Sequence, residues 1–249
     1  MDPTKLDSNE KCKLVANLYR VQSRVFSGVS QADFGRYVVY SKAAETSILI
    51  FKNSKGVIVG YHALHFFEKR VQGRACMIVR AESGLLKRYR GLSSTFGFSV
   101  RKFLECKLRY PLHDAYYFGC MVHPAAYVLP ARYAGQYWPN AAKPTPPEIL
   151  HLMQELADEF QLKTSANKSP LIRNVGWKTR ETGREQSYWQ NCKNADMRYF
   201  VEINPNFGDG DGLLTLVPIS FYNLRTVTTR FLLPKVYSAA RDFLAARSS

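Results

Sequence analysis

The chain has 249 residues and a formal net charge of +15, and 46% of its residues are hydrophobic. This composition excludes a disordered or fibrous protein, because the apolar residues suffice to bury a large core. The sequence contains no apolar run of about 20 residues, the length that a membrane-spanning helix needs, and its polar N-terminal residues do not form a signal region. We therefore expect a soluble, cytoplasmic protein.

The cysteine and histidine residues do not suggest a metal site or a disulfide framework. The five cysteines are odd in number and widely spaced, which favours reduced core thiols. His62 and His65 are three residues apart on an expected strand, so their side chains should point to opposite faces. Asp209 and Asp211 lack the further oxygen ligands and the distal Glu of a calcium loop. We expect no bound metal.

The first part of the chain predicts a helix followed by three strands. Asp7 and Glu10 fit a capping box, and apolar residues recur at helical spacing over residues 7–26. Residues 47–67 predict two antiparallel strands around a turn at 53–56. Residues 75–81 predict a third strand, which leads into a short basic loop.

This loop is the most informative stretch of the sequence, because it joins a strand to the start of a helix. Its small residues precede a helix that ends before Pro111. The N-terminus of a helix presents unpaired N–H groups and the positive end of the helix dipole, which favour a phosphate. An ordinary helix N-cap at Ser93 or Ser94 is the alternative. The predicted phosphate site consists of Arg90, Gly91, Leu92, Ser93, Ser94 and Thr95.

The second half of the chain alternates between apolar and polar segments. Residues 115–122 predict a strand inside a sheet, and the segment that begins at His123 contains Pro130, which argues against a regular helix. After a loop over 136–147, Thr145 and Glu148 predict the start of a helix. Residues 163–194 form a polar insertion.

The last part of the chain predicts a hairpin and a helix. Strands are expected over 198–203 and 213–219, joined by a turn rich in Gly and Asp. Pro234 is expected to open a final helix.

Tyr89-Arg90-Gly91 resembles the opening of the pyrophosphate loop in the GNAT family of acyl-CoA N-acyltransferases, with Ser93 and Thr95 at positions where the family prefers Gly or Ala. The order of strands, loop and helices is also similar to that of the family. The resemblance implies an α/β fold with a mixed, mostly antiparallel sheet flanked by helices. It implies an acyltransferase domain over 1–222, with an insertion at about 140–195, and a C-terminal helical extension over 223–249.

The resemblance implies direct transfer of an acyl group from a thioester to an amine, without a protein nucleophile. The co-substrate would be acyl-CoA or the acyl-phosphopantetheine of an acyl carrier protein. Backbone N–H groups of Ile78, Val79 and Arg80 would polarise the thioester carbonyl. The acceptor would be an amino acid or another small molecule bearing an amine.

The resemblance also implies groups that move protons. Glu82 or His123 would take the proton of the amine. Tyr133 would protonate the leaving thiolate, with Tyr127 as the alternative residue for this role. The ordinary alternatives are a surface ion pair for Glu82 and a satisfied core or loop histidine for His123.

Positive charge gathers between residues 69 and 109, beyond the footprint of a CoA molecule. Such a field would suit the acidic surface of an acyl carrier protein, as in long-chain N-acyl amino acid synthases, or would merely aid solubility. A non-catalytic module that binds nucleic acid is the alternative of another class. Phe66, Phe67 and Phe103 fit core stripes better than exposed stacking platforms. The cations concerned include Lys69, Arg70, Arg74, Lys102, Lys107 and Arg109.

Overall fold

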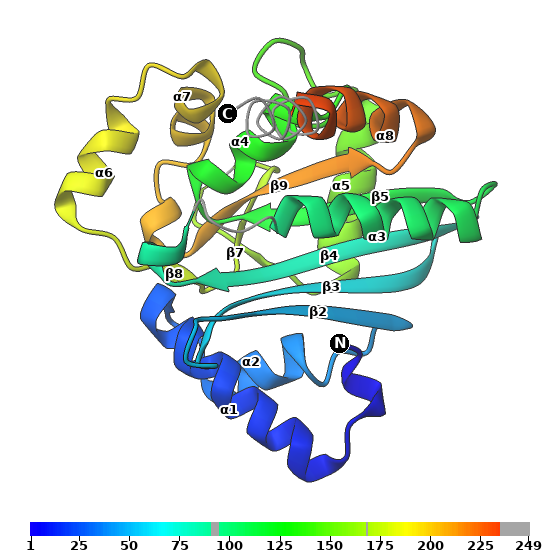
Figure 1. The fold of residues 1–249 in the computed structure, drawn as a ribbon. Helices are drawn as coiled ribbons and strands as arrows, with labels where there is room; N and C mark the ends of the chain where they lie inside the picture. Colours follow the sequence, from blue (N-terminus) through cyan, green and yellow to red (C-terminus); the bar gives the residue numbers. More distant parts are fainter. Residues whose placement is uncertain (91–94, 168, 235–249) are drawn as a thin grey trace, which may run out of the picture.

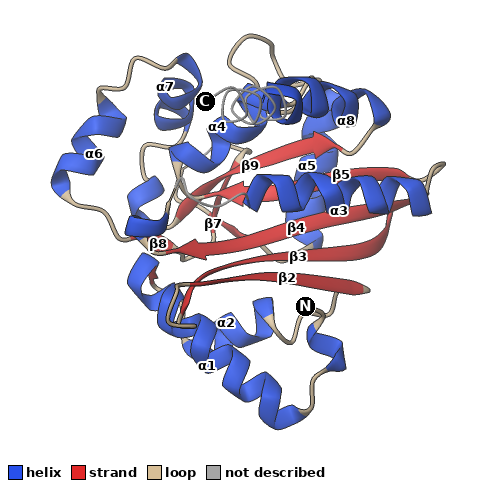
Figure 2. Ribbon diagram, in the orientation of Figure 1, coloured by secondary structure: helices blue, strands red, loops and turns tan. Residues whose placement is uncertain are grey.

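We analysed a computed structural model of the chain, which describes residues 1–90, 95–167 and 169–234. Within these residues the centre is a seven-stranded sheet of order β2-β3-β4-β5-β9-β7-β6 (Figure 1). β4 and β5 are parallel, whereas the other neighbours are antiparallel. Helices flank this sheet, so the expected fold class is confirmed (Figure 2).

The strands of the sheet are β2 (Glu45–Lys52), β3 (Ile58–Val71), β4 (Arg74–Leu85), β5 (Asp114–Met121), β6 (Lys163–Thr164), β7 (Ile172–Asn174) and β9 (Asp211–Pro218). A separate two-stranded ladder consists of β1 (Phe26–Ser27) and β8 (Lys178–Thr179). The α-helices are α1 (Ser8–Val25), α2 (Gln31–Val38), α3 (Thr95–Arg109), α4 (Pro124–Tyr133), α5 (Pro147–Glu159), α6 (Gly183–Gln190), α7 (Ala195–Ile203) and α8 (Phe221–Val227). Short helical turns are η1 (Pro3–Lys5), η2 (Lys87–Tyr89), η3 (Phe207–Asp209) and η4 (Thr228–Leu232).

Local chemistry explains the elements at the start of the chain. The Asp7 side chain accepts from Glu10 N at 2.8 Å and the Glu10 side chain accepts from Asp7 N at 2.9 Å, which confirms the predicted capping box. The turn before β3 is closed by Asn53, whose side chain accepts two backbone N–H groups. β3 turns into β4 at Gln72 and Gly73, both in the left-handed region that a tight hairpin requires.

The two faces of the sheet carry different helices, and this divides the side chains of β4 into two sets. Met77 and Val79 pack with Cys106 of α3 on one face. Ile78, from the alternate position, packs with Leu156 of α5 on the opposite face. The face that a β4 residue lies on therefore follows from its place in the alternation.

The structure overturns the predicted hairpin at 198–219, because residues 198–203 belong to helix α7. Asn194 caps this helix by accepting from Met197 N at 3.0 Å, and the buried Phe200 packs against Tyr127 of α4. A short apolar run in a sequence cannot distinguish a strand from a buried helical turn. β9, the predicted second strand, pairs with β5 and β7 instead. The polar segment 163–194 contains β6 and β7, and both strands belong to the main sheet.

Two other expectations about helix boundaries are wrong. α4 continues through Pro130, and the Ala134 N–H donates to Pro130 O at 2.9 Å, so the loss of one hydrogen bond does not end the helix. α5 begins after Pro146 without a side-chain cap, rather than at a capping box on Thr145. The residue before a proline is held in an extended conformation, which explains the late start.

The C-terminal part begins as helix, with α8 followed by the π-helical turn η4. The predicted helix after Pro234 lies almost entirely outside the described residues. Among the described residues, no helix is long and apolar enough to cross a membrane. Cys76 and Cys106 are buried thiols as expected, whereas Cys12 is exposed.

Candidate active site

The central feature of the site is a gap in the sheet. β4 and β5 pair only from Cys76 with Asp114 to Val79 with Tyr117. Beyond these residues β4 continues as a partner of β3, and β5 continues as a partner of β9. Within the part of the chain that the structure describes, the facing edges of β4 and β5 therefore carry backbone groups without a ladder partner after Val79. The sequence prediction placed carbonyl polarisation at Ile78, Val79 and Arg80. Ile78 and Val79 are still paired with β5, and the strands separate after Val79.

A cavity of about 580 Å³ passes through this gap. On the α3 side its wall includes Ser83, Ser99 and Phe103, and on the α5 side it includes Arg80 and Phe160. Because residues from both faces of the sheet line one continuous space, two molecules approaching from opposite faces can meet between β4 and β5. A cavity of this volume is typical of a site for small molecules.

Glu82 lines this cavity and contacts a buried histidine. His65 Nε2 lies 3.0 Å from Glu82 Oε2, and the two side chains are 2% and 15% exposed. Thr46 holds the other ring nitrogen of His65 at 3.0 Å. Burial tends to raise the pKa of Glu82, but His65 and Arg80 outweigh it, and the pKa lies below its ordinary value.

His62 is the centre of a second polar cluster, which lies on the α3 side of the same cavity. Its Nδ1 contacts the Ser83 hydroxyl, and its Nε2 lies 2.7 Å from the Ser99 hydroxyl. Ser99 donates to Thr95 O at 3.2 Å, so its oxygen accepts from His62 Nε2–H and leaves Nδ1 to accept from Ser83. His62 and His65 lie on opposite faces, as the spacing predicted. Burial lowers the pKa of His62 to about 4, so the imidazole is neutral at pH 7.

The low pKa of His62 predicts acid-sensitive stability. Between pH 6.5 and about 4 the unfolded chain binds a proton that the folded chain does not bind. The free energy of unfolding therefore decreases as the pH is lowered through this range. The expected loss attributable to His62 is about 3 kcal/mol. Urea unfolding of the wild type and of His62→Gln, in which the amide still donates and accepts, measures it. A pH dependence that is the same in both proteins would contradict the assignment.

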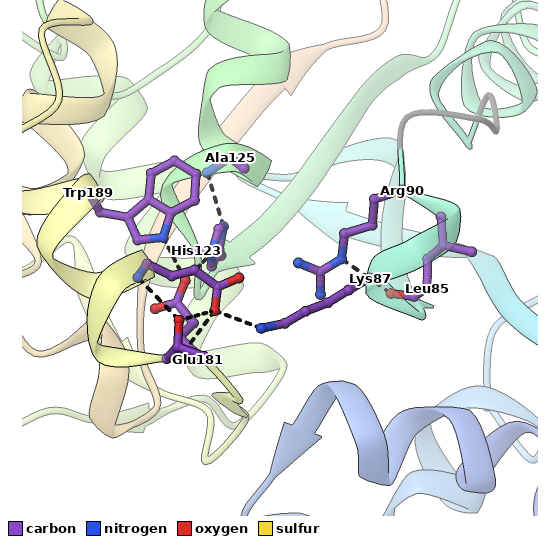
Figure 3. A network of polar contacts seen from close by, with 9 residues as sticks. Leu85, Lys87, Arg90, His123, Ala125, Glu181 and Trp189 are labelled. Atoms are coloured by element: carbon purple, nitrogen blue, oxygen red, sulfur yellow. Dashed lines mark hydrogen bonds and ion pairs between the residues drawn. The ribbon is translucent and has the colours of Figure 1, made fainter.

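His123 lies at the N-terminus of α4 and is fully engaged. Its Nδ1 accepts from Ala125 N at 3.1 Å, so the proton resides on Nε2, which donates to Glu181 at 2.7 Å. Glu181 also accepts from the indole of Trp189 at 2.6 Å. Figure 3 shows Glu181 between these two rings, with Lys87 extending from the opposite segment. With both ring nitrogens engaged, the imidazole has no lone pair free for an amine.

Three tyrosines are candidates for protonating the leaving thiolate. Tyr133 and Tyr127 were predicted from the sequence, and the structure adds Tyr117. Tyr133 packs its ring against Phe96 at 5.2 Å and is not part of the cavity wall. Tyr127 is fully buried and donates to Pro139 O at 2.9 Å. Tyr117 lines the cavity where β5 leaves β4. Burial raises the pKa of Tyr117, with the charge of Glu82 adding to it, so the phenol stays protonated.

The expected phosphate loop is described only at its two ends. Gly91, Leu92, Ser93 and Ser94 lie outside the described residues. Arg90, before the gap, donates from Nε to Leu85 O at 3.3 Å (Figure 3). Thr95, after it, begins α3 and lines the cavity. The N-terminus of α3 therefore faces the same space as the gap between the strands.

Several polar groups in or beside the cavity wall could not be predicted from the sequence. These residues come from separate elements and share no motif, and a strand register is needed to bring His62 opposite Ser83. The one usable signal was a polar residue at an otherwise apolar strand position. The groups concerned are His62, Ser83, Ser99, Tyr117 and Glu181. Among the described residues, no group of three or more potential ligands could hold a metal ion.

Comparisons with known proteins gave partial likenesses. No family model and no curated protein matches the sequence. The ribosomal-protein-alanine N-acetyltransferase from Brucella melitensis biovar Abortus 2308 is similar at 14% identity and a TM-score of 0.27, over 44% of this chain and 72% of that chain. A mutant of the BH1408 protein from Bacillus halodurans is similar at 16% identity and a TM-score of 0.24, over 43% and 68%.

Proposed function

We propose that this chain is an N-acyltransferase that moves an acyl group from a thioester directly to an amine. The observation that carries the proposal is the cavity through the gap between β4 and β5, which opens where the pairing ends at Val79 and Tyr117. An extended thioester arm can bind to an unpaired strand edge through its amide groups, as added strands do. The N-terminus of α3, at the same cavity, suits the phosphates of the donor.

In this mechanism the amine nitrogen attacks the thioester carbon, and the C–S bond breaks as the thiolate leaves. The backbone N–H of Ala81, the first on the β5-facing edge of β4 beyond the paired residues, stabilises the negative oxygen of the tetrahedral intermediate. Once the amine has attacked, its ammonium proton is acidic and passes to Glu82, directly or through water. A base of lowered pKa can accept this proton, since the intermediate gives it up readily. We prefer Glu82 to His123 because both nitrogens of His123 are engaged.

The leaving thiolate needs a hydrogen-bond donor, and we assign this role to Tyr117. Tyr117→Phe is expected to lower kcat by about 100- to 1000-fold, because one donor to a developing anion is lost. Tyr133→Phe is expected to change kcat by less than about threefold, since Tyr133 packs outside the cavity wall. Steady-state kinetics on both variants test the assignment. A large loss in Tyr133→Phe alone would return the role to Tyr133.

Acyl-CoA is the proposed donor, and an acyl carrier protein is the alternative. In the structure Lys102 and Arg109 bind Glu45, and Lys69 binds Glu159, so part of the predicted surplus charge is paired. The C-terminal end of α3 lies about 20 Å from its N-terminus, given the rise of a helix. Arg88 and Arg90 precede the N-terminus of α3 in the chain, and the described residues provide no carboxylate partner for either.

The function is tested by mixing the protein with acyl-CoA thioesters of short and long chains, or with acyl-carrier protein, and a panel of amines. Release of free thiol that depends on the amine, together with the mass of an acylated amine, would support the proposal. If no donor yields thiol or product, the proposal fails. Tight binding of generic DNA or RNA that weakens steeply with salt would instead support the nucleic-acid alternative.

A further inference from the structure

We propose that the acceptor is an α-amino acid whose carboxylate is bound by Arg80; this inference rests on the proposed acyltransferase function. Arg80 lines the cavity directly after Val79, the last β4 residue paired with β5. Its guanidinium lies 4.6 Å from the centre of the Phe160 ring. Among the described residues it has no carboxylate or hydrogen-bond partner, although a guanidinium carries five donors.

The position of Arg80 in the strand places it on the acceptor side. Arg80 and Glu82 are two residues apart on β4, so both side chains lie on the face that carries α5. Ser83 and the α3 N-terminus, where we place the donor, lie toward the other face. The positive charge of Arg80 acts on Glu82, Tyr117 and Cys120, all of which line the cavity. A free cation therefore stands within the cavity beside the proposed base.

The spacing fits an amine and a carboxylate on adjacent positions of one small molecule. Residues i and i+2 of a strand are about 6.6 Å apart. An α-amino acid carries its amine and its carboxylate on one carbon, so Arg80 and Glu82, neighbours on the same face of β4, can converge on the two groups at once. A planar guanidinium is the side chain best suited to hold a carboxylate through two parallel bonds. Charge repulsion between the acceptor carboxylate and Glu82 is offset by Arg80.

The surrounding wall suits the rest of such a molecule. Leu162 packs in the same cluster as Phe160, and Val175 and Trp177 add further apolar side chains to the cavity wall. Lys163, which follows Leu162, adds a second cation to the same cavity. The site thus combines a fixed positive charge, a carboxylate base and apolar walls, and this combination selects an amino acid over a simple amine or a polyamine.

The test uses three acceptors that differ at one group: phenylalanine, phenylalaninamide and 2-phenylethylamine. We expect kcat/KM for phenylalanine to exceed that for the amide by about 10- to 100-fold, the range of a charge-assisted pair. In Arg80→Gln this preference should disappear, and in Arg80→Lys part of it should return. Arg70→Gln, which removes an exposed arginine of β3 outside the cavity wall, is the matched control and should keep the preference.

A binding measurement separates this inference from the function on which it rests. Calorimetric titration with N-octanoyl-phenylalanine and with its primary amide should show tighter binding of the acid, by at least about 10-fold, and equal binding in Arg80→Gln. Transfer to all three acceptors without preference, with equal affinity for acid and amide, would overturn the role of Arg80 and leave the acyltransferase standing. If no amine is acylated, the acyltransferase proposal fails, and equal affinities would then reject the carboxylate site as well.

Discussion

Replacing Glu82 with glutamine is expected to lower kcat for acyl transfer by about 10²- to 10⁴-fold, the usual contribution of a positioned base. The amide keeps the shape of the side chain but cannot take the proton of the tetrahedral intermediate. In the wild type the pKa of Glu82 lies below 4.5, because His65 and Arg80 outweigh the effect of burial. The acidic limb that Glu82 adds to the kcat profile should therefore lie below pH 4.5, and Glu82→Gln should lack it.

Two matched variants separate catalysis from structure in this experiment. Glu68→Gln removes a carboxylate from β3 outside the cavity wall and should leave kcat unchanged. His123→Asn keeps a side chain able to cap α4 and should lose far less activity than Glu82→Gln. Thermal unfolding of each variant controls for the loss of the His65–Glu82 contact. Full turnover and an unchanged pH profile in a folded Glu82→Gln protein would leave positioned water as the base.

Elements with strong local signals could be predicted from the sequence, and those that depend on tertiary pairing could not. The capping box at Asp7, the turn at Asn53 and the strand of residues 115–122 all follow from short-range chemistry. Residues 198–203 were assigned to a strand because they carry β-branched and aromatic residues, yet packing on α4 makes them helical. The assignment of β7 to the main sheet had no local signal, because this strand is only three residues long.

The same distinction applies to the site. Glu82 and Arg80 could be chosen because they end an apolar strand, and the structure places both on the wall of one cavity. The engagement of His123 could not be anticipated, since Glu181 lies in a polar segment 58 residues later in the chain. The contacts of His62 with Ser83 and Ser99 depend on the register of β3 with β4 and on the position of α3 against the sheet. Such contacts require the fold itself.

Filling the gap between the strands is expected to abolish transfer while the protein remains folded. Gly119 lies on β5 beyond Tyr117 and borders the cavity. A Cβ at this position would approach Tyr117 Oη and Met121 Cε at 3.0 Å each, and both atoms end side chains that can move. Gly119→Leu should therefore fill the opening, displace the Tyr117 hydroxyl and lower kcat/KM by at least about 100-fold, as small misplacements in a reacting pair do.

The size of the added side chain provides the internal control for this prediction. Gly119→Ala should lose less activity than Gly119→Leu, because the methyl group leaves most of the passage open. Gly208→Leu places the same side chain where a Cβ meets no atom within 4 Å, outside the cavity wall, and should retain full activity. Donor affinity, measured by titration with CoA, should fall together with kcat/KM if the thioester arm passes between β4 and β5. A folded Gly119→Leu protein with normal turnover would show that the donor does not use this gap.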